Sequence, residues 1–351
     1  MNKKNRPVIA AVDLFCGAGG LTKGLENAGI DVRLGVDIDP ACEYPYEVNT
    51  DAIFLRDSVE TLNGREMKQI YEGAQYSLLA GCAPCQPFST YAQGWSDPSD
   101  HRWGLLGQFA RLVEETAPDL VTMENVPRLQ HQDVFQNFVS RLKALKFHVT
   151  YRVVNCAAYG VPQQRERLVL LASTLGPIKM LSPFRSPKKF RTVRQAIGSM
   201  PVLKAGGVDK DDPLHKAASL SEVNLERIKA SKAGGTWRDW KPDLVAECHT
   251  KQSGKTYPGV YGRMRWKEPS PTITTQFFGF GNGRFGHPTQ ARAISLREGA
   301  ILQSFPRTYK FFPPGDEVHY KSMGRLIGNA VPVKLGKAIG RSLVKHVEAF
   351  G

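Results

Sequence analysis

The sequence predicts an α/β fold in which a parallel sheet is covered by helices, followed by a smaller and irregular domain. Three observations support this prediction. Short apolar runs alternate with stretches of helical periodicity up to about residue 175, the alternation stops there, and positive charge concentrates in the part that follows. A chain of 351 residues is longer than most single cores, so one large and one smaller domain are expected.

Six apolar runs have the length and composition of buried strands. They are VIAAVDLF (8–15), VRLGVDI (32–38), YSLLAG (76–81), DLVTMENV (119–126), FHVTYRVV (147–154) and RLVLLAS (167–173). Between them, stretches such as LLGQFARLVEETA (105–117) repeat apolar residues at helical spacing. Such an alternation is typical of a parallel sheet covered by helices, and we expect this architecture for residues 1–175.

The charge is concentrated in the middle of the chain. Residues 176–290 hold 20 basic and nine acidic residues, a net +11 out of the +14 of the whole chain. The segment starts with the linker-like PIKMLSPFRSPKKFR and is rich in Gly and Pro, so we predict a separate domain at 176–290. A hinge and return segment is expected at 291–324, and a C-terminal helix at 325–351 that completes the first domain. An excess of Lys and Arg on one module favours a polyanionic partner over an ordinary solvated surface.

Targeting signals are not evident. No apolar run approaches the roughly 20 residues that cross a bilayer, and the opening MNKKNRPVIAAVDLF lacks a small-residue cleavage site. Six cysteines are too few for a disulfide framework in a chain of this length. We therefore expect a cytoplasmic protein without a membrane partner, in which the cysteines are thiols.

A nucleotide-type pocket is predicted near the N-terminus. DLFCGAGGLTKGL (13–25) reads as a strand, a glycine-rich turn and a helix, which lets a ligand approach backbone N–H groups closely. Asp37 ends the second strand, where a carboxylate can accept hydrogen bonds from ribose hydroxyls. The spacing is not Gly-x-Gly-x-x-Gly, because Thr22 occupies the last position. The pattern indicates a nucleoside-containing cofactor but does not separate a dinucleotide from S-adenosylmethionine.

A candidate nucleophile follows the third run. In GCAPCQPFST (81–90), Pro84 and Pro87 hold Cys85 in a stiff, non-helical loop just past the carboxyl end of a strand. Cys82 and Cys85 also form a Cys-x-x-Cys pair, so a redox pair or half of a zinc site are alternatives. The remaining cysteines are scattered singly and no metal site is expected, while the residues up to 100 read as a loop and not as the helix of a redox motif.

Two further segments supply charged side chains. MENVP (123–127) leaves Glu124 at the end of another strand, and QQRERL (163–168) brings Arg165 and Arg167 to the start of the last one. Alternate residues of an extended segment share a face, so both guanidinium groups are expected to reach one site. Thiol, carboxylate and arginines would then meet at one edge of the sheet, beside the glycine-rich loop.

At this point the sequence resembles the carbon-5 cytosine-specific DNA methyltransferases of the bacterial restriction-modification type. The resemblance covers nearly the whole chain in order: DLFCGAGGL, VDIDP, RDS, GCAPCQPFS, TMENV, QQRER, SPTITT with GRFGHP, RAISLREGAILQSFP and GNAVP. It implies a Rossmann-like, S-adenosylmethionine-dependent methyltransferase sheet with a smaller, irregular target-recognition domain. The basic segment would be that domain.

The resemblance also implies roles for individual residues. The catalytic residues would be Cys85, Glu124, Arg165 and Arg167. S-adenosylmethionine would be surrounded by Phe15, Ala18, Gly20, Asp37, Ile38, Asp57, Ser58, Pro84, Leu105, Asn329 and Ala330. DNA would be contacted by Gln86, Ser89, Thr272, Thr274 and Arg284. One departure is Ile38, where many relatives carry an aromatic residue that covers the adenine.

The implied reaction fits these residue types. Thiolate addition at carbon 6 of cytosine makes carbon 5 nucleophilic, a protonated Glu124 would bind the ring N3 and the amino group, and Arg165 would hold the carbonyl and Glu124 or the loop. The cytosine must leave the duplex to be reached, so base flipping is implied. We expect a monomer that produces 5-methylcytosine and S-adenosylhomocysteine, with a separate restriction or defence nuclease as its counterpart.

Two other functions remain open from the sequence. The first is a transfer-RNA cytosine-5 methyltransferase, because a branch of the same family has similar motifs; the long basic domain favours DNA. The second is a catalytically silent nucleic-acid binder, which the intact Cys85, Glu124 and Arg165 disfavour. Methylation of amino groups is disfavoured because no Asn-Pro-Pro-Tyr or Asp-Pro-Pro-Tyr motif occurs.

Overall fold

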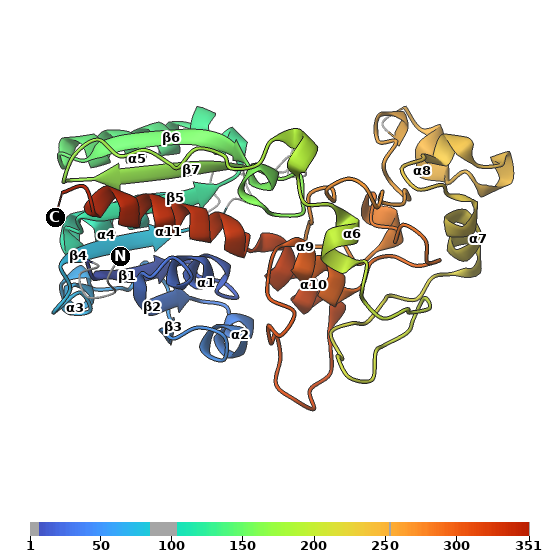
Figure 1. Ribbon diagram of the computed structural model, residues 1–351, viewed down its shortest axis with the longest axis horizontal. Coiled ribbons are helices and arrows are strands. Elements are labelled where there is room, and N and C mark those ends of the chain that lie inside the picture. Colours follow the sequence, from blue (N-terminus) through green and yellow to red (C-terminus); the bar gives the residue numbers. More distant parts are fainter. Residues whose placement is uncertain (1–6, 85–103, 253, 351) are drawn as a thin grey trace. The chain divides into compact units, whose positions relative to one another are not determined.

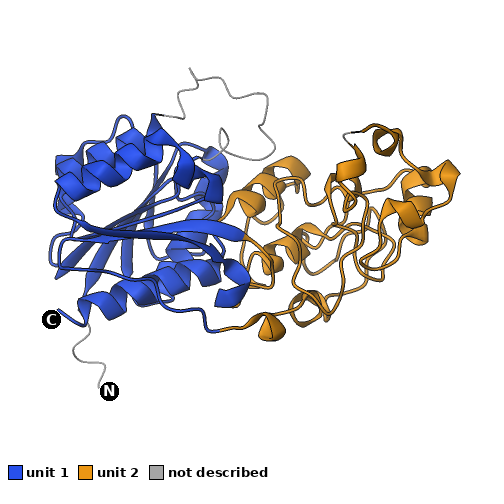
Figure 2. Ribbon diagram, turned by 90° about the horizontal axis from the view of Figure 1, so that it is seen from above, with its two compact units in different colours: residues 1–159, 166–184, 331–351 blue, residues 160–165, 185–330 orange. Residues whose placement is uncertain are grey.

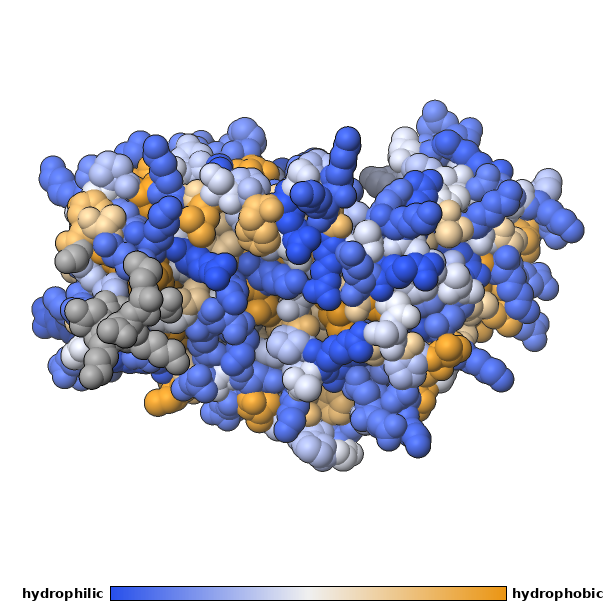
Figure 3. Space-filling model, in the orientation of Figure 1, coloured by the Kyte–Doolittle hydropathy of each residue, from blue (hydrophilic) through white to orange (hydrophobic). Residues whose placement is uncertain are grey.

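The computed structural model describes residues 7–84, 104–252 and 254–350 (Figure 1). Contacts divide these residues into two compact units, coloured separately in Figure 2. The first unit consists of the described residues within 1–159, 166–184 and 331–351, and the second of those within 160–165 and 185–330. Among the described residues, no helix is both long and apolar enough to span a membrane. On the face drawn in Figure 3, hydrophilic residues predominate and apolar ones are scattered.

The first unit is built on a seven-stranded sheet. Its strands are β1 (Ile9–Leu14), β2 (Asp31–Asp37), β3 (Ile53–Arg56), β4 (Tyr76–Gly81), β5 (Leu120–Asn125), β6 (His148–Asn155) and β7 (Glu166–Ser173). All six residues of β1 and of β5 are buried, as expected for central strands covered on both faces. The sheet and its covering helices confirm the predicted α/β, Rossmann-like fold.

The strand order β3-β2-β1-β4-β5-β7-β6 sets the position of the candidate site. Strands β1 to β5 run parallel to one another, and the chain order reverses between β1 and β4. Open α/β sheets bind ligands at such a reversal, outside the carboxyl ends of the strands. The loops after β1 and β4, which hold the glycine-rich turn and the start of the cysteine motif, leave the sheet at this point.

The expectation of a wholly parallel sheet was wrong. Strand β7 lies between β5 and β6 and is antiparallel to both. The reason lies in the connection from β6 to β7, which spans only residues 156–165, whereas a crossover between parallel strands takes a dozen or more residues. Strand β3 was missed because only Phe54 among its four residues is buried, which leaves no alternating pattern.

Helices cover both faces of the sheet in the first unit (Figure 2). They are α1 (Gly20–Glu26), α2 (Glu43–Glu47), α3 (Gly64–Gln69), α4 (Leu105–Thr116), α5 (Asp133–Ala144) and α11 (Val333–Val347). Helix α4 contacts α3 and α5, and its buried residues recur at helical spacing. The rings of Phe109 of α4 and Phe138 of α5 contact each other in a tilted arrangement, with centroids 5.3 Å apart, and join one core with the inner residues of β1, β4, β5 and β7.

Helix α11 returns the C-terminus to the first unit, where it packs along α1. A Cβ atom at Gly24 of α1 would lie 2.6 Å from backbone atoms of Gly336, so glycines at this crossing permit close backbone contact. The C-terminal segment does not form the single helix expected from residue 325. Helix α10 (Tyr320–Asn329) ends in the second unit, and α11 begins after Pro332, which cannot donate within a helix.

The second unit has little regular structure. Its other helices are α6 (Val193–Ile197), α7 (Glu222–Ala230), α8 (Glu247–Thr250) and α9 (Leu296–Leu302). Among the described residues of this unit, isolated bridges link the extended segments, such as Gly286 with Arg263 and with Ala293. Besides residues 160–165 the unit consists of residues 185–330, which include the segment 291–324 that the sequence predicts to be a hinge and return segment.

Candidate active site

The loop between β1 and α1 is shaped by backbone conformations that few residues adopt. Phe15, Gly17 and Gly19 all have positive φ, at 57°, 54° and 81°. A Cβ atom at Gly17 would meet no described atom within 4 Å, so the turn borders open space. Ala18 and Gly20, predicted to line the cofactor, lie in the same turn and are buried.

Asp37 anchors this loop to the end of β2. Its Oδ2 accepts the Gly17 N–H at 2.9 Å, and its Oδ1 accepts the Asp39 N–H at 3.0 Å. The next residue, Ile38, leaves 70% of its surface exposed, which is unusual for a large apolar side chain. At the end of β3, Asp57 Oδ1 accepts the N–H of Ser58 at 2.7 Å. The predicted cofactor residues that follow β1, β2 and β3 therefore lie at the same edge of the sheet, at the carboxyl ends of these strands.

Asp13, a buried carboxyl group that the sequence analysis did not single out, lies on β1 just before this loop. Asp13 is 1% exposed, and its Oδ2 accepts the Thr22 hydroxyl at 2.7 Å. The Thr22 hydroxyl lies 3.0 Å from the hydroxyl of Tyr46, which is fully buried. Burial raises the pKa of Asp13 to about 7, although the hydrogen bond from Thr22 acts in the opposite direction. This chain of polar groups ties α1 and α2 to the end of β1.

Glu124 has charged and polar neighbours from both adjacent strands. It lies on β5 and is 3% exposed. The Cys82 thiol donates to Glu124 Oε2 at 3.1 Å, and Arg167 Nε lies 3.0 Å from Glu124 Oε1 as an ion pair. Because the N–H of Arg167 is not directed at it, Oε1 accepts no hydrogen bond from the part of the chain that the structure describes.

Register explains why these side chains meet. Gly81 of β4 pairs with Met123 of β5, so the next residue of each strand, Cys82 and Glu124, stand side by side. Asn125 then donates from Nδ2 to the carbonyl of Ala83 at 2.9 Å and holds the start of the cysteine loop. Cys85, Gln86 and Ser89 lie outside the described residues, and Pro84 is the last described residue before them.

Arg165 has partners different from those of Arg167. It belongs to the second unit, where its guanidinium donates to the carbonyls of Ile273 at 2.9 Å and Gly328 at 3.1 Å. The expected contact with Glu124 is made within the first unit by Arg167. In these contacts the two arginines, although two residues apart, bind different groups.

The neighbouring glutamines hold the same segment of the second unit. Gln163 accepts the Ile273 N–H on Oε1 at 2.8 Å and donates to Gln303 Oε1 at 2.9 Å. Thr272 donates its hydroxyl to the carbonyl of Gln164 at 2.9 Å. The backbone of Thr274 packs against Gly328, close to the predicted cofactor residues Asn329 and Ala330 that end α10.

Arg284, predicted to contact DNA, is half-buried in the second unit. Its Nη1 donates to the carbonyl of Gly235, and burial, followed by the neighbouring Arg265, lowers its pKa. Leu105, predicted to contact the cofactor, opens α4 and is 9% exposed. Among the described residues, no group of three or more His, Cys, Asp or Glu side chains could hold a metal ion.

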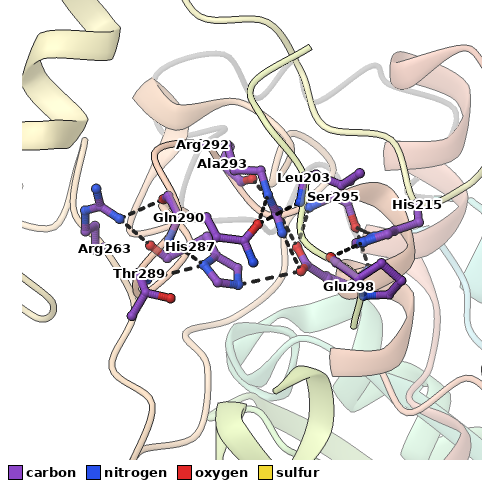
Figure 4. Close-up of polar contacts among 11 residues, drawn as sticks. Leu203, His215, Arg263, His287, Thr289, Gln290, Arg292, Ala293, Ser295 and Glu298 are labelled. Atoms are coloured by element: carbon purple, nitrogen blue, oxygen red, sulfur yellow. Dashed lines mark hydrogen bonds and ion pairs between the residues drawn. The ribbon is translucent and has the colours of Figure 1, made fainter. Parts of the chain in front are cut away.

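A buried ion pair organises residues 287–298 of the second unit (Figure 4). Arg292 binds Glu298 through two parallel contacts of 2.7 and 2.8 Å, and both side chains are fully buried. Glu298 also accepts the Ser295 N–H at 2.7 Å in a capping box that starts α9. His287 Nε2 lies 3.8 Å from Glu298, and burial lowers the pKa of His287 to about 4. The motif RAISLREG is thus held together by buried contacts between its own residues.

Sequence comparison extends over nearly the entire chain. A family model described as C-5 cytosine-specific DNA methylase matches residues 9–345. The chain is 49% identical to the Type II methylase M.HgiDII of Herpetosiphon aurantiacus over 346 residues, covering 98% of this chain and 97% of that protein. It is 32% identical to the Type II methyltransferase M.Sau96I of Staphylococcus aureus, covering 96% of this chain and 76% of that protein.

Solved structures share the fold. A prophage-encoded Escherichia coli protein described as a DNA modification methyltransferase superposes with a TM-score of 0.70 at 22% identity, covering 97% of this chain and 99% of that one. The Dnmt2 methyltransferase of S. pombe superposes with a TM-score of 0.60 at 17% identity, again covering 97% and 99%.

Proposed function

Because the chain belongs to the C-5 cytosine-specific DNA methylase family, we propose that it methylates a cytosine flipped out of duplex DNA, with S-adenosylmethionine as the methyl donor. The protein is a DNA (cytosine-5-)-methyltransferase, as its family and its Type II relatives establish. The proposal concerns the cofactor and the residues that act. The observation that carries it is the buried Glu124 carboxyl group, which accepts a hydrogen bond from Cys82 at the start of the cysteine motif.

The glycine-rich loop fits an adenosine-containing cofactor. Gly17 borders open space, and the Asp37 carboxylate stands at the end of β2, where a carboxylate can accept hydrogen bonds from ribose hydroxyls. Exposed Ile38 would lie against the adenine. When bound, S-adenosylmethionine would supply an electrophilic methyl group. Phe15, Ala18, Gly20, Asp57, Ser58, Pro84 and Leu105 of the first unit and Asn329 and Ala330 of the second are the other residues proposed to hold it.

Cys85 is the proposed nucleophile. Its thiolate would add to carbon 6 of cytosine, which makes carbon 5 electron-rich enough to take the methyl group. Loss of the carbon-5 proton and elimination of Cys85 would then release 5-methylcytosine. A target inside a duplex is inaccessible to such an attack, so the base must be extruded.

Glu124 is the proposed acid and hydrogen-bond partner of the ring. Protonated on one oxygen, it would donate to N3 as the negative charge develops, while the other oxygen accepts from the amino group. Oε1 is suited to this contact, because it accepts no hydrogen bond from the described residues. Arg167 would hold the carboxyl group in place through its ion pair. Arg165 is proposed to hold the cytosine carbonyl.

The second unit is proposed to be the target-recognition domain. Arg185, Arg191 and Arg307 lie close enough that their like charges, after burial, lower the pKa of Arg191. Arg191 is fixed to the carbonyl of Gln195, and Arg307 to the hydroxyl of Ser199 at 2.6 Å, so both flank α6. Within the described residues none of these arginines pairs with a carboxylate, which favours phosphate groups as their partners. Thr272, Thr274 and Arg284, with Gln86 and Ser89 of the cysteine loop, are further proposed DNA contacts.

The decisive experiment combines substrate choice with adduct trapping. The protein is incubated with methyl-labelled S-adenosylmethionine and either duplex DNA or transfer RNA, and the labelled nucleoside is identified after digestion. We expect 5-methyldeoxycytidine from DNA alone; label confined to RNA would refute the DNA assignment. DNA carrying 5-fluorocytosine cannot lose the carbon-5 substituent as a proton, so a covalent complex at Cys85 should accumulate with the wild type and not with Cys85→Ser.

Glu124→Gln tests the acid. The amide keeps the shape but cannot donate a proton, so single-turnover methylation should slow by at least about 100-fold while cofactor binding persists. A wild-type single-turnover rate would remove Glu124 from this role. We further propose that the enzyme acts as a monomer and forms the modification half of a restriction-modification system, as the Type II designation of its relatives suggests.

A further inference from the structure

Cys82 is hydrogen-bonded to Glu124, the carboxyl group proposed to act on the cytosine ring. Its Sγ donates to Glu124 Oε2 at 3.1 Å, and its backbone N–H donates to the carbonyl of Leu14 at 3.2 Å. The half-buried residue is thus fixed at both ends, by β1 through its backbone and by β5 through its side chain. The pairing of Gly81 with Met123 makes this contact a direct result of strand register.

The two oxygens of Glu124 have different surroundings. Oε2 accepts the thiol, while Oε1 faces Arg167 in an ion pair and accepts no hydrogen bond from the described residues. A carboxylate held by Arg167 alone could rotate about its last torsion, because terminal sp³–sp² torsions are broad. The thiol removes this freedom and decides which oxygen remains available. The acceptor is a carboxyl group that forms an ion pair with Arg167, and a hydrogen bond to an ionised acceptor is stronger than one between neutral groups.

We propose that Cys82 is a positioning residue for catalysis: its S–H fixes the plane of the Glu124 carboxyl group, so that Oε1, which pairs with Arg167 but accepts no hydrogen bond from the described residues, can meet the flipped cytosine. The inference rests on the role proposed for Glu124. It also gives the first cysteine of the Cys-x-x-Cys pattern a function other than redox chemistry or zinc binding. If Cys82 only filled space in the core, its burial would be the same, but the methylation rate would not depend on its S–H donor.

The test compares variants that keep or remove the donor. Cys82→Ala should lower the single-turnover methylation rate by about 10-fold, the loss expected for one charge-assisted hydrogen bond. The KM for DNA and the dissociation constant for S-adenosylmethionine should stay within about twofold, because Cys82 is proposed to act on the chemical step. Cys82→Ser keeps a hydroxyl donor and should recover the rate to within about threefold.

Controls separate this role from packing. Cys82→Thr and Cys82→Val have the same shape and differ in the hydroxyl donor, so Thr should be the faster variant even if Cys82→Ala folds poorly. Cys248→Ala removes an exposed thiol in the second unit and should behave as wild type. Melting temperatures are recorded for every variant to exclude unfolding as the cause.

Each outcome is informative. Equal single-turnover rates for the wild type and Cys82→Ala would overturn the inference and leave the proposed function intact. Equal losses in the Ser and Ala variants, or in the Thr and Val variants, would show that the donor is irrelevant and also overturn it. A wild-type protein that transfers no methyl group to DNA would instead refute the proposed function.

Discussion

Replacement of Asp13 by Asn should remove most of the pH dependence that this buried carboxyl group gives to the unfolding free energy of the first unit. Burial raises the pKa of this carboxyl group from its ordinary value of 3.8 to about 7. Between these pH values the folded protein keeps a proton that the unfolded chain has lost, so the free energy of unfolding falls as the pH rises. Each pKa unit is worth about 1.4 kcal/mol, so the total loss is about 4 kcal/mol by pH 7.

The assay is urea unfolding of wild type and Asp13→Asn at intervals between pH 4 and pH 8. Hydrogen exchange of the β1 amides, measured in parallel, shows whether the change in stability belongs to the first unit. The difference in unfolding free energy should move in favour of the variant by about 4 kcal/mol across this range. His287 acts in the opposite direction, because its lowered pKa of about 4 makes the second unit less stable as the pH falls from 6.5. Its contribution is common to both proteins and cancels in the difference.

Thr22→Val is the matched variant. It retains the Asp13 carboxyl group but removes the hydrogen bond to Oδ2, which favours the ionised form. The pKa of Asp13 should rise further, so the loss of unfolding free energy should continue to higher pH than in the wild type. Parallel curves for the wild type and Asp13→Asn from pH 4 to pH 8 would refute the reasoning.

Three other perturbations test the packing and the DNA surface. Gly24→Ala places a Cβ atom 2.6 Å from the Gly336 backbone and should cost about 1–3 kcal/mol of unfolding free energy; an unchanged urea midpoint would contradict the close α1–α11 packing. Glu298→Gln leaves the buried Arg292 cation without its carboxylate and should cost about 3–5 kcal/mol, measured by thermal unfolding; a loss under about 1 kcal/mol would contradict it. Arg191→Ala with Arg307→Ala should reduce the slope of log affinity against log salt concentration by about 2 in anisotropy titrations with DNA, and an unchanged slope would exclude both phosphate contacts.

Much of the first unit follows from local sequence pattern. The runs at 8–15, 76–81 and 119–126 predict β1, β4 and β5 to within a residue at each end or better, because central strands are apolar throughout. The pattern fails at the edges of the sheet. Strand β3 has one buried residue, and the direction of β7 depends on the length of a connection, not on the composition of the strand.

The candidate site shows the same division between local and non-local information. Glu124 could be predicted because it ends an apolar run, whereas its contact with Cys82 joins residues 42 positions apart. Such a contact depends on which strands are neighbours and on their register, and a single sequence specifies neither. Asp13 was missed for a related reason, since a carboxyl group at the end of a strand gives no sign of being buried until α1 and α2 cover it.

The QQRER motif shows how adjacent residues can serve different parts of a protein. The extended conformation predicts a common site for Arg165 and Arg167, and the boundary between the two units falls between these residues. Arg165 and Gln163 form hydrogen bonds with backbone groups of Ile273. Arg167, the second residue of β7, forms an ion pair with Glu124. One short motif therefore supports the interior of the second unit and the carboxyl group of the first. Two residues apart in the sequence, Arg165 binds carbonyl groups of the second unit and Arg167 the carboxyl group of Glu124 in the first.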